Sequence, residues 1–254
     1  MLVFFYDKTF EGLLTAVFDA YNRRTFPDKI LPNGAIPPMF MEDSYTVITQ
    51  EDKAVRVWAA LEKKMNKQAC NMLTHAWLSE AEGSEELLFR YIRKTIDSKI
   101  SIETNFGDSD VLEIHQLARK VSHEGHYLRM FIRFQKAADD IFFAPISPVY
   151  NALPLAVEHF ADRFSDQKWV IYDLKRKYGY YYDLKTVVEI TLEGDANHLL
   201  TGKLDENLMA EDEKLFQELW KGYFKSMTIK ERINPKLQRQ HMPRRFWKYL
   251  TEKQ

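Results

Sequence analysis

The stretch that decides the fold runs from Trp169 to Leu192 and reads WVIYDLKRKYGYYYDLKTVVEITL. Trp169 to Leu174 and Tyr180 to Leu184 are rich in apolar and aromatic residues, and Lys175 to Gly179 between them predicts a turn. Val187 to Leu192 can add one more strand. Such hairpins, combined with helix pairs elsewhere in the chain, favour an α+β fold over a doubly wound sheet.

A second hairpin is predicted upstream of the first. Met130 to Phe134 alternates in period two, and Ile141 to Ala144 can pair with it across the turn at Ala138 to Asp140. A helix from about Ser109 leads into this hairpin, and a helix over Asn151 to Phe164 follows it. We therefore expect antiparallel hairpins packed against helices in the C-terminal part of the chain.

The N-terminal part is predicted to be mainly helical. Leu2 to Tyr6 and Tyr45 to Thr49 read as short strands, and the proline-rich stretch Asn22 to Ser44 between them reads as a loop. Elsewhere apolar residues recur at helical spacing, and Ser84 is a natural N-cap. The expected boundary separates residues 1–105 from 106–254, unless both parts form one continuous domain.

The composition is typical of a folded protein of the cytoplasm. Of the 254 residues, 45% are hydrophobic and 14% aromatic, which is enough to bury a core. No apolar stretch approaches the ~20 residues that cross a bilayer, and the start of the chain lacks signal-peptide features. Cys70 is the only cysteine, which excludes an intrachain disulfide and a thiolate-rich zinc site. We expect a cytoplasmic location and no membrane contact.

The common catalytic motifs are absent from the sequence. It has no glycine-rich phosphate loop, no nucleophile elbow and no zincin helix. An enzyme built on this chain would need an unfamiliar arrangement of residues, and the sequence predicts neither a metal nor a cofactor for it.

Basic residues concentrate towards the C-terminus. The whole chain has a net charge of −1, but Lys221 to Gln254 holds ten Lys and Arg against two acidic residues. That segment therefore carries +8 and the remainder −9. Such asymmetry between segments indicates an acidic partner better than the total charge does.

The run Asn234 to Lys253, here called the basic tail, interleaves cations with aromatic rings. Cations neutralise phosphates and rings stack on bases, so the tail and the arginine just before it predict contact with nucleic acid. Alternatively, Phe246 and Trp247 dock on the core while the charges stay solvated. The predicted contacts are Arg232, Lys236, Arg239, His241, Arg244, Arg245, Trp247 and Lys248.

An acidic residue lies on the apolar face of the helix predicted upstream. Glu124 projects between Leu117, Val121 and Leu128, provided that Gly125 does not break the helix. A carboxylate facing a core costs several kcal/mol unless it is paired or hydrogen-bonded. Glu124 is thus either salt-bridged to an arginine or held for acid/base chemistry.

Basic residues lie on the opposite face of the same helix. His115, Arg119 and His126 form either an ordinary polar face or a groove for phosphates. On the next helix His159 and Arg163, at positions i and i+4, extend that groove or form a surface pair.

Two runs of the sequence are long enough to be specific: KVSHEGH at Lys120 to His126 and PRRFWKYL at Pro243 to Leu250. Further such runs are Tyr6 to Leu14, Val17 to Tyr21, Lys53 to Trp58, Phe131 to Gln135, Asn151 to Leu155, His159 to Phe160, Arg163 to Phe164, Asp166 to Trp169, and Glu231 to Pro235. Through these runs the chain resembles a bacterial family of DNA metabolism and DNA repair proteins that contains a domain of unknown function.

The resemblance implies a role in DNA repair or modification. Members of the family are typically encoded beside a radical S-adenosylmethionine DNA repair protein, which is therefore the expected protein partner. The S-adenosylmethionine and the Fe–S cluster are expected in that partner and not in this chain. A related C-terminal half is fused to uracil-DNA-glycosylase-like domains. The family supplies no established reaction or active site.

The sequence departs from the family pattern at two positions. Lys8 stands where the family tends to have glycine, and Tyr127 stands where the family usually has arginine after Glu-x-His. If that arginine binds phosphate, Arg129 or Arg133 is the candidate to replace it.

Three hypotheses follow. In the first, the chain is an accessory DNA-binding protein in which Glu124 organises the site while His126, Arg133 and the basic tail contact DNA. In the second, it is a DNA-processing enzyme that uses Glu124 as general acid/base with His126 or His241 as its partner. In the third, it is an interaction module whose aromatic tail binds a protein.

Overall fold

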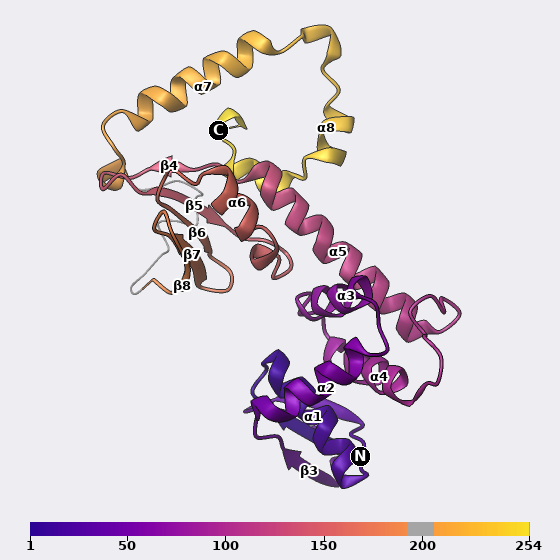
Figure 1. Ribbon diagram of the computed structural model, residues 1–254. Coiled ribbons are helices and arrows are strands. Elements are labelled where there is room, and N and C mark those ends of the chain that lie inside the picture. The colour runs from indigo at the N-terminus through magenta and orange to yellow at the C-terminus, as the bar shows by residue number, and fades with distance from the viewer. Residues whose placement is uncertain (193–205, 254) are drawn as a thin grey trace. The chain divides into compact units, whose positions relative to one another are not determined.

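The computed structural model describes residues 1–192 and 206–253, which form two compact units (Figure 1). One unit comprises Met1–Ser122 and the other His123–Gln254, so that the division falls inside helix α5 (Ser109–Phe131). The boundary expected after residue 105 lies shortly before this helix and stays a prediction. The two units are described separately below.

The N-terminal unit is built on a three-stranded parallel sheet of order β2-β1-β3. The strands are β1 (Leu2–Tyr6), β2 (Lys29–Pro32) and β3 (Asp43–Thr46). Helices α1 (Phe10–Arg23), α2 (Glu51–Glu62), α3 (Lys67–Trp77), α4 (Ser84–Asp97) and the first part of α5 bury their apolar faces in its core.

Three expectations for this unit need correction. Strand β2 lies inside the stretch predicted as a loop, because its pairing with β1 is long-range and leaves no local pattern. Strand β3 ends at Thr46, so only part of the predicted strand exists. The N-cap of α4 is Gly83, with φ of 76°, and Ser84 is already helical; glycine takes this left-handed conformation without a steric penalty.

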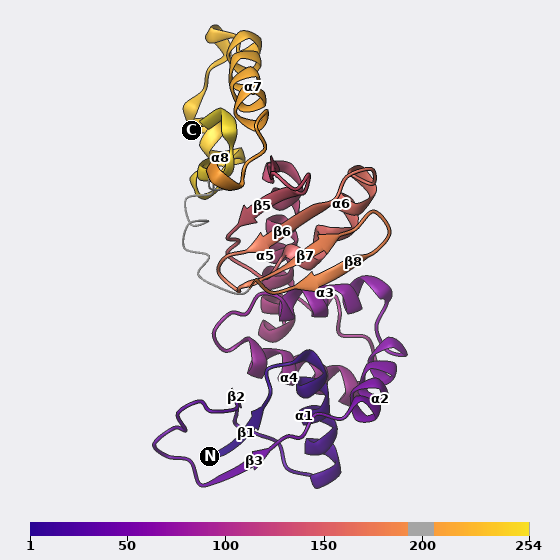
Figure 2. The same ribbon diagram turned by 90° about the vertical axis from the view of Figure 1, so that its left-hand side faces the viewer.

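The C-terminal unit contains a five-stranded sheet of order β4-β5-β6-β7-β8, of which Figure 2 labels β5 to β8. Its strands are β4 (Gln135–Lys136), β5 (Phe142–Ile146), β6 (Trp169–Asp173), β7 (Tyr178–Tyr182) and β8 (Val187–Ile190). Strands β5 and β6 are parallel and the other pairs antiparallel. The predicted hairpin and the strand after it are thereby confirmed, and the protein has an α+β fold.

The upstream hairpin exists but begins later than predicted. Helix α5 continues through Phe131, so the expected strand Met130 to Phe134 is wrong, and only Gln135 and Lys136 pair with β5. Leu128 and Phe131 are three residues apart and both are buried, so the apolar residues at this end of α5 also fit one face of a helix. Gly125 does not break α5; a Cβ there would lie 3.3 Å from the Cβ of Leu155.

Helix α6 (Val157–Arg163) follows a short 3-10 turn, η1 (Leu153–Leu155), and connects the two parallel strands. Its Phe160 ring packs against the Trp169 ring of β6 at 6.4 Å between centroids, so α6 covers one face of the sheet. The predicted helix therefore starts later than Asn151. None of the helices within the described ranges is both long and apolar enough to cross a bilayer.

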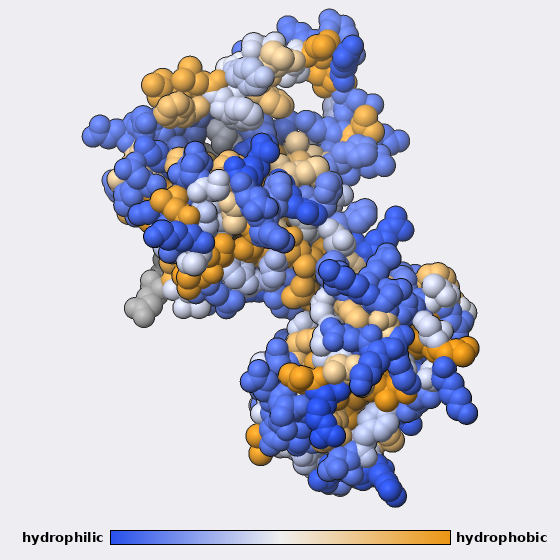
Figure 3. Space-filling view, in the orientation of Figure 1, coloured by the Kyte–Doolittle hydropathy of each residue, from blue (hydrophilic) through white to orange (hydrophobic). Residues whose placement is uncertain are grey.

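The last part of the chain is helical. It contains η3 (Glu206–Leu208), α7 (Glu213–Met227), η4 (Lys230–Arg232), α8 (Pro235–His241), η5 (Arg244–Tyr249) and η6 (Thr251–Lys253). Phe246, Tyr249 and Leu250 are buried, whereas α7 exposes several large apolar side chains. Figure 3 shows hydrophobic residues at the surface over α7.

Candidate functional site

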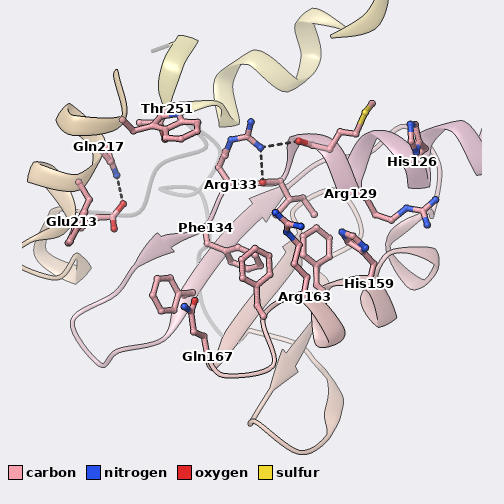
Figure 4. A pocket seen from close by; sticks show the side chains of 17 residues that line it. His126, Arg129, Arg133, Phe134, His159, Arg163, Gln167, Glu213, Gln217 and Thr251 are labelled. Carbon is pink, nitrogen blue, oxygen red and sulfur yellow. Dashed lines mark hydrogen bonds between the residues drawn. The ribbon is translucent and has the colours of Figure 1, made fainter. Parts of the chain in front are cut away.

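The C-terminal unit contains a cavity of about 900 Å³ (Figure 4). Its lining comes from α5 and the segment after it, from α6 and the loop that follows, from α7, and from Phe142 and Thr251. These parts differ in chemistry. Helices α5 and α6 supply arginines and histidines, the segment after α5 supplies the Phe134 ring, and α7 supplies both rings and polar groups.

One end of the cavity is basic. His126 and Arg129 are three residues apart on α5, and His159 and Arg163 are four apart on α6, so each helix turns one histidine and one arginine to the same side. Figure 4 shows these four side chains on the same side of the cavity. Within residues 1–192 and 206–253, no carboxylate forms an ion pair with either arginine.

Arg133 also lines the cavity, but its guanidinium is already engaged. Nη1 donates to the carbonyl oxygens of Met130 and Ile132 at 3.0 and 3.1 Å, and Nη2 donates to Oε1 of Glu252 at 3.0 Å. Trp220 donates its Nε1–H to the other oxygen of Glu252 at 2.9 Å. Of the two arginines proposed to replace the missing one, Arg129 is therefore the one available to a ligand.

The carboxylate of Glu252 is held in its charged form. Burial alone would raise its pKa, but hydrogen bonds from Trp220 and from the backbone, together with the charge of Arg133, lower the pKa below its ordinary value. The side chain is only 3% exposed. Glu252 thus joins the end of α5 to α7 and holds this wall of the cavity in place.

Aromatic rings line the middle of the cavity. The Phe134 ring lies between the basic side chains and α7 in Figure 4, and it packs against Phe160 and Phe164 at 5.7 and 5.3 Å between centroids. Phe216 and Trp220 reach the cavity from α7 and are partly exposed. Rings that are fixed on one side and accessible on the other are suited to stack on a planar ligand.

The side of the cavity opposite the basic residues is polar (Figure 4). Glu213 is buried, and its carboxylate accepts the Lys136 backbone N–H at 3.0 Å and the Gln217 Nε2–H at 2.8 Å. These bonds fix the orientation of the Gln217 amide and leave its carbonyl oxygen and one N–H available. Glu213, Phe216, Gln217 and Trp220 share one face of α7 because they are three, four and seven residues apart.

Glu124, the predicted acid/base, is occupied by structural contacts. Its side chain is 2% exposed and forms an ion pair with Arg245, while its other oxygen accepts the Val149 backbone N–H at 2.9 Å. Arg245 is 39% exposed and lies over the rings of Tyr127 and Phe246. Glu124 does not line the cavity that contains His126. Of the two alternatives given for Glu124, these contacts match the carboxylate that is salt-bridged to an arginine.

The basic tail docks on its own unit. The Phe246 ring lies 5.3 Å from that of Phe131 and 5.8 Å from that of Tyr127, and Trp247 donates its Nε1–H to the Met242 carbonyl at 3.0 Å. Only Thr251 of this segment lines the cavity described above. Docking of the rings is thus the alternative that the geometry favours.

The charges of the tail are dispersed. Arg232 and His241 line a smaller cavity of about 590 Å³ together with apolar side chains such as Ile233. Lys236 is exposed, and Arg239 donates to the carbonyl of Pro235 at 3.0 Å. Arg244 lies over the Trp247 ring and Lys248 over the Tyr249 ring. Their contact with nucleic acid stays a prediction.

Two residues of the predicted groove lie in the N-terminal unit. His115 and Arg119 line a cavity of about 470 Å³ there, where the His115 Nε2 lies 3.0 Å from the Glu103 carbonyl and its ring contacts Phe106. Of the residues of the predicted groove, His126, His159 and Arg163 line the cavity of the C-terminal unit, and His115 and Arg119 line this cavity of the N-terminal unit.

The sequence patterns did not predict several of the residues that line the cavity. The sequence indicates Arg129 only as a replacement for the arginine of the family pattern, and it indicates no ligand contact for Phe134, Phe216, Gln217 and Trp220. The repeated spacing along α7 is the signal that could have indicated the last three. The described residues contain no group of three or more His, Cys, Asp and Glu side chains placed to hold a metal ion.

The protein thus combines an α+β fold with a cavity that is lined by arginines and histidines at one end and by aromatic rings in the middle. The chain belongs to the family described as a domain of unknown function, DUF4130, whose sequence model matches residues 82–252. No curated protein matches the chain. A solved structure, the pGpG-specific phosphodiesterase PggH from Vibrio cholerae, aligns over 71% of this chain and 81% of its own, with 11% identity and a TM-score of 0.33. A likeness at that TM-score supports no conclusion.

Proposed function

We propose that this protein binds nucleic acid and acts in DNA metabolism, with the basic end of the C-terminal cavity as its principal contact. The observation that carries the proposal is the convergence of Arg129, Arg163, His126 and His159 beside accessible aromatic rings. Guanidinium groups donate bidentate hydrogen bonds to phosphate oxygens, and rings stack on bases. A nucleic acid offers phosphates and bases at once, so it can use both kinds of contact.

The resemblance to DNA repair proteins supports a more specific role. In this proposal the chain is an accessory partner of a radical S-adenosylmethionine enzyme, which supplies the cofactor and the Fe–S cluster. This chain supplies the contact with DNA. Glu124 has a positioning role, because its carboxylate holds Arg245 and the Val149 backbone and so anchors the docked tail to α5.

A second candidate function, a protein-interaction module, is favoured by a different observation. Leu215, Leu219, Tyr223 and Met227 on α7 are all more than half exposed. Apolar side chains gathered on one helix are typical of a surface that binds another protein. The two candidates differ in whether the purified chain binds an oligonucleotide.

The test is a fluorescence anisotropy titration of a labelled single-stranded and a labelled duplex oligonucleotide at several salt concentrations. We expect salt-sensitive binding by the unaltered chain. The variant Arg129→Gln/Arg163→Gln should bind about tenfold more weakly, and the slope of log K against log salt should fall in magnitude by about 1 to 2, as expected for two lost phosphate contacts.

The matched control removes the same charge elsewhere in the unit. Lys177→Gln/Lys185→Gln alters two exposed lysines that line none of the cavities described, and it should change the affinity by less than about twofold. Equal losses in both double variants, or no salt-sensitive binding at all, contradict the proposal. Nuclease-resistant capture of a protein without oligonucleotide binding establishes the interaction module instead.

A further inference from the structure

We infer that the cavity receives a single unstacked nucleotide, with its phosphates at the basic end and its base among the rings against Gln217. This inference deepens the proposed function and rests on it. It commits to a ligand of one nucleotide, whereas nucleic-acid binding alone requires only a charged surface.

The first support is the polarity of the cavity. Basic side chains from α5 and α6 lie on one side, Glu213 and Gln217 on the opposite side, and Phe134 between them (Figure 4). A nucleotide has the same order of chemistry: an anion at one end, hydrogen-bonding groups on the base edge at the other, and a planar apolar surface along the base. A bare phosphate uses only the basic side, and an apolar ligand uses only the rings.

The second support is the size of the cavity. Its volume of about 900 Å³ lies within the roughly 300–1,000 Å³ of pockets that enclose one small molecule. A base within a duplex is stacked on both faces and presents only its edges. It can therefore enter such a cavity only after leaving the stack, which proteins that act on single bases achieve by flipping the nucleotide out.

The third support is the fixed amide at the polar side. Glu213 is 7% exposed and is held by the Lys136 backbone N–H, and it in turn holds the Gln217 Nε2. The remaining carbonyl oxygen and N–H of Gln217 offer one acceptor and one donor in a set direction. A base edge presents the complementary pair, as in the glutamine–adenine pairs of DNA-binding proteins. A site that only stacked bases would not need a buried carboxylate behind the amide.

The fourth support is that the wall is preorganised. Glu252 receives hydrogen bonds from Arg133 and Trp220, which joins the end of α5 to α7 across the cavity wall. Phe134 is fixed by Phe160 and Phe164. Groups that are held in place before binding lose little conformational freedom when the ligand arrives.

The experiment measures how well parts of a nucleotide compete with a labelled oligonucleotide for the full chain. The probes are the four deoxynucleoside 5′-monophosphates, the corresponding nucleosides, and deoxyribose 5-phosphate. At least one monophosphate should compete, and its nucleoside and deoxyribose 5-phosphate should each compete at least tenfold more weakly, because each lacks one end of the ligand.

Two variants test the end of the cavity that lies opposite the arginines. Phe216→Ala removes an exposed ring and Gln217→Leu removes the amide. Each should lower the affinity for the competing monophosphate by about fivefold or more. Leu219→Ala is the control, because Leu219 is on the same helix with nearly the same exposure (58% against 57% for Phe216) and does not line the cavity. It should change the affinity by less than twofold.

The outcomes separate this inference from the proposed function. Salt-sensitive oligonucleotide binding without competition by any monophosphate overturns the single-nucleotide site and leaves nucleic-acid binding intact. An effect of Phe216→Ala no larger than that of Leu219→Ala overturns it as well. Loss of oligonucleotide binding by the unaltered chain overturns both proposals.

Discussion

Two groups of basic residues in the C-terminal unit differ in what their side chains do. The basic tail is dense in cations, but Arg245 is committed to Glu124, and Arg244 and Lys248 lie over rings of the tail itself. The basic end of the cavity is formed by Arg129, Arg163 and two histidines, which come from the two helices α5 and α6. Although the cavity group is the smaller one, its side chains line a single cavity.

The difference shows that charge density along a sequence is a poor guide to a binding site. A run of cations beside aromatic residues also fits a segment that docks by its rings and satisfies some of its charges internally. The two arginines and two histidines on α5 and α6 form no dense run in the sequence, but they line one cavity once the helices pack. The following predictions test this contrast.

The largest expected effect is on stability and comes from the tail. Arg245→Met leaves the buried Glu124 without its counter-ion, which should lower the free energy of unfolding by about 2–3 kcal/mol, less than for a fully enclosed pair because Arg245 is partly exposed. Urea unfolding measures the change. Arg244→Met, the neighbouring control, should cost less than about 0.5 kcal/mol. The double variant Glu124→Gln/Arg245→Met should recover part of the loss; a purely additive result contradicts the coupling.

The next effect compares DNA affinity directly between the two groups. Lys236→Gln/Arg239→Gln/Arg244→Gln removes three charges from the tail, and Arg129→Gln/Arg163→Gln removes two from the cavity. We expect less than about threefold weakening for the tail variant and about tenfold for the cavity variant. The reverse order in an anisotropy titration would return the nucleic-acid interface to the tail.

A smaller effect appears as the pH falls. Because the folded-state pKa of Glu252 is lowered, its contribution to stability is present above the ordinary value of 4.5 and is lost as the pH drops through the folded pKa. The stability difference between the unaltered chain and Glu252→Gln should therefore be largest near neutral pH and shrink in acid. A difference that stays constant with pH would show that Glu252 does not act through its charge.

The smallest effect is expected at Gly125, between the residues that serve the tail and the cavity. Gly125→Ala gains helix propensity of about 1 kcal/mol, offset by the close approach of the new Cβ to Leu155 at 3.3 Å. The net change in stability should be below about 1 kcal/mol, and the DNA affinity should stay the same. A large loss of affinity would mean that the position of His126 depends on this packing.

Local patterns predicted the fold where the pairing is local. The hairpin of β6 and β7 was predicted because its strands and turn are contiguous. Strand β2 was missed because its partner β1 precedes it by a helix, and parallel pairing over that distance leaves no turn signal. The end of α5 was misread because Met130 to Phe134 satisfies the strand period while Leu128 and Phe131 satisfy the helical one.

Three residues of the candidate site were predictable one by one, but the whole set was not. His126, His159 and Arg163 were chosen for their spacing on single helices, and that choice depends only on helical geometry. Their meeting with α7 depends on tertiary packing, which single-helix patterns do not contain. Glu124 was placed correctly on an apolar face, but its partner Arg245 is 121 residues away in the sequence.

That separation has a consequence for how the protein folds. The hydrogen bond between Arg133 and Glu252, which closes the cavity wall, joins residues 119 positions apart in the sequence. The ion pair between Glu124 and Arg245, which anchors the tail, joins residues 121 positions apart. Contacts between such distant residues form slowly because a long loop must be closed first, whereas the β6–β7 hairpin closes a loop of a few residues. The sheet can therefore assemble well before the cavity exists. A ligand that binds only the finished cavity would stabilise the last step of folding and slow unfolding from the native state.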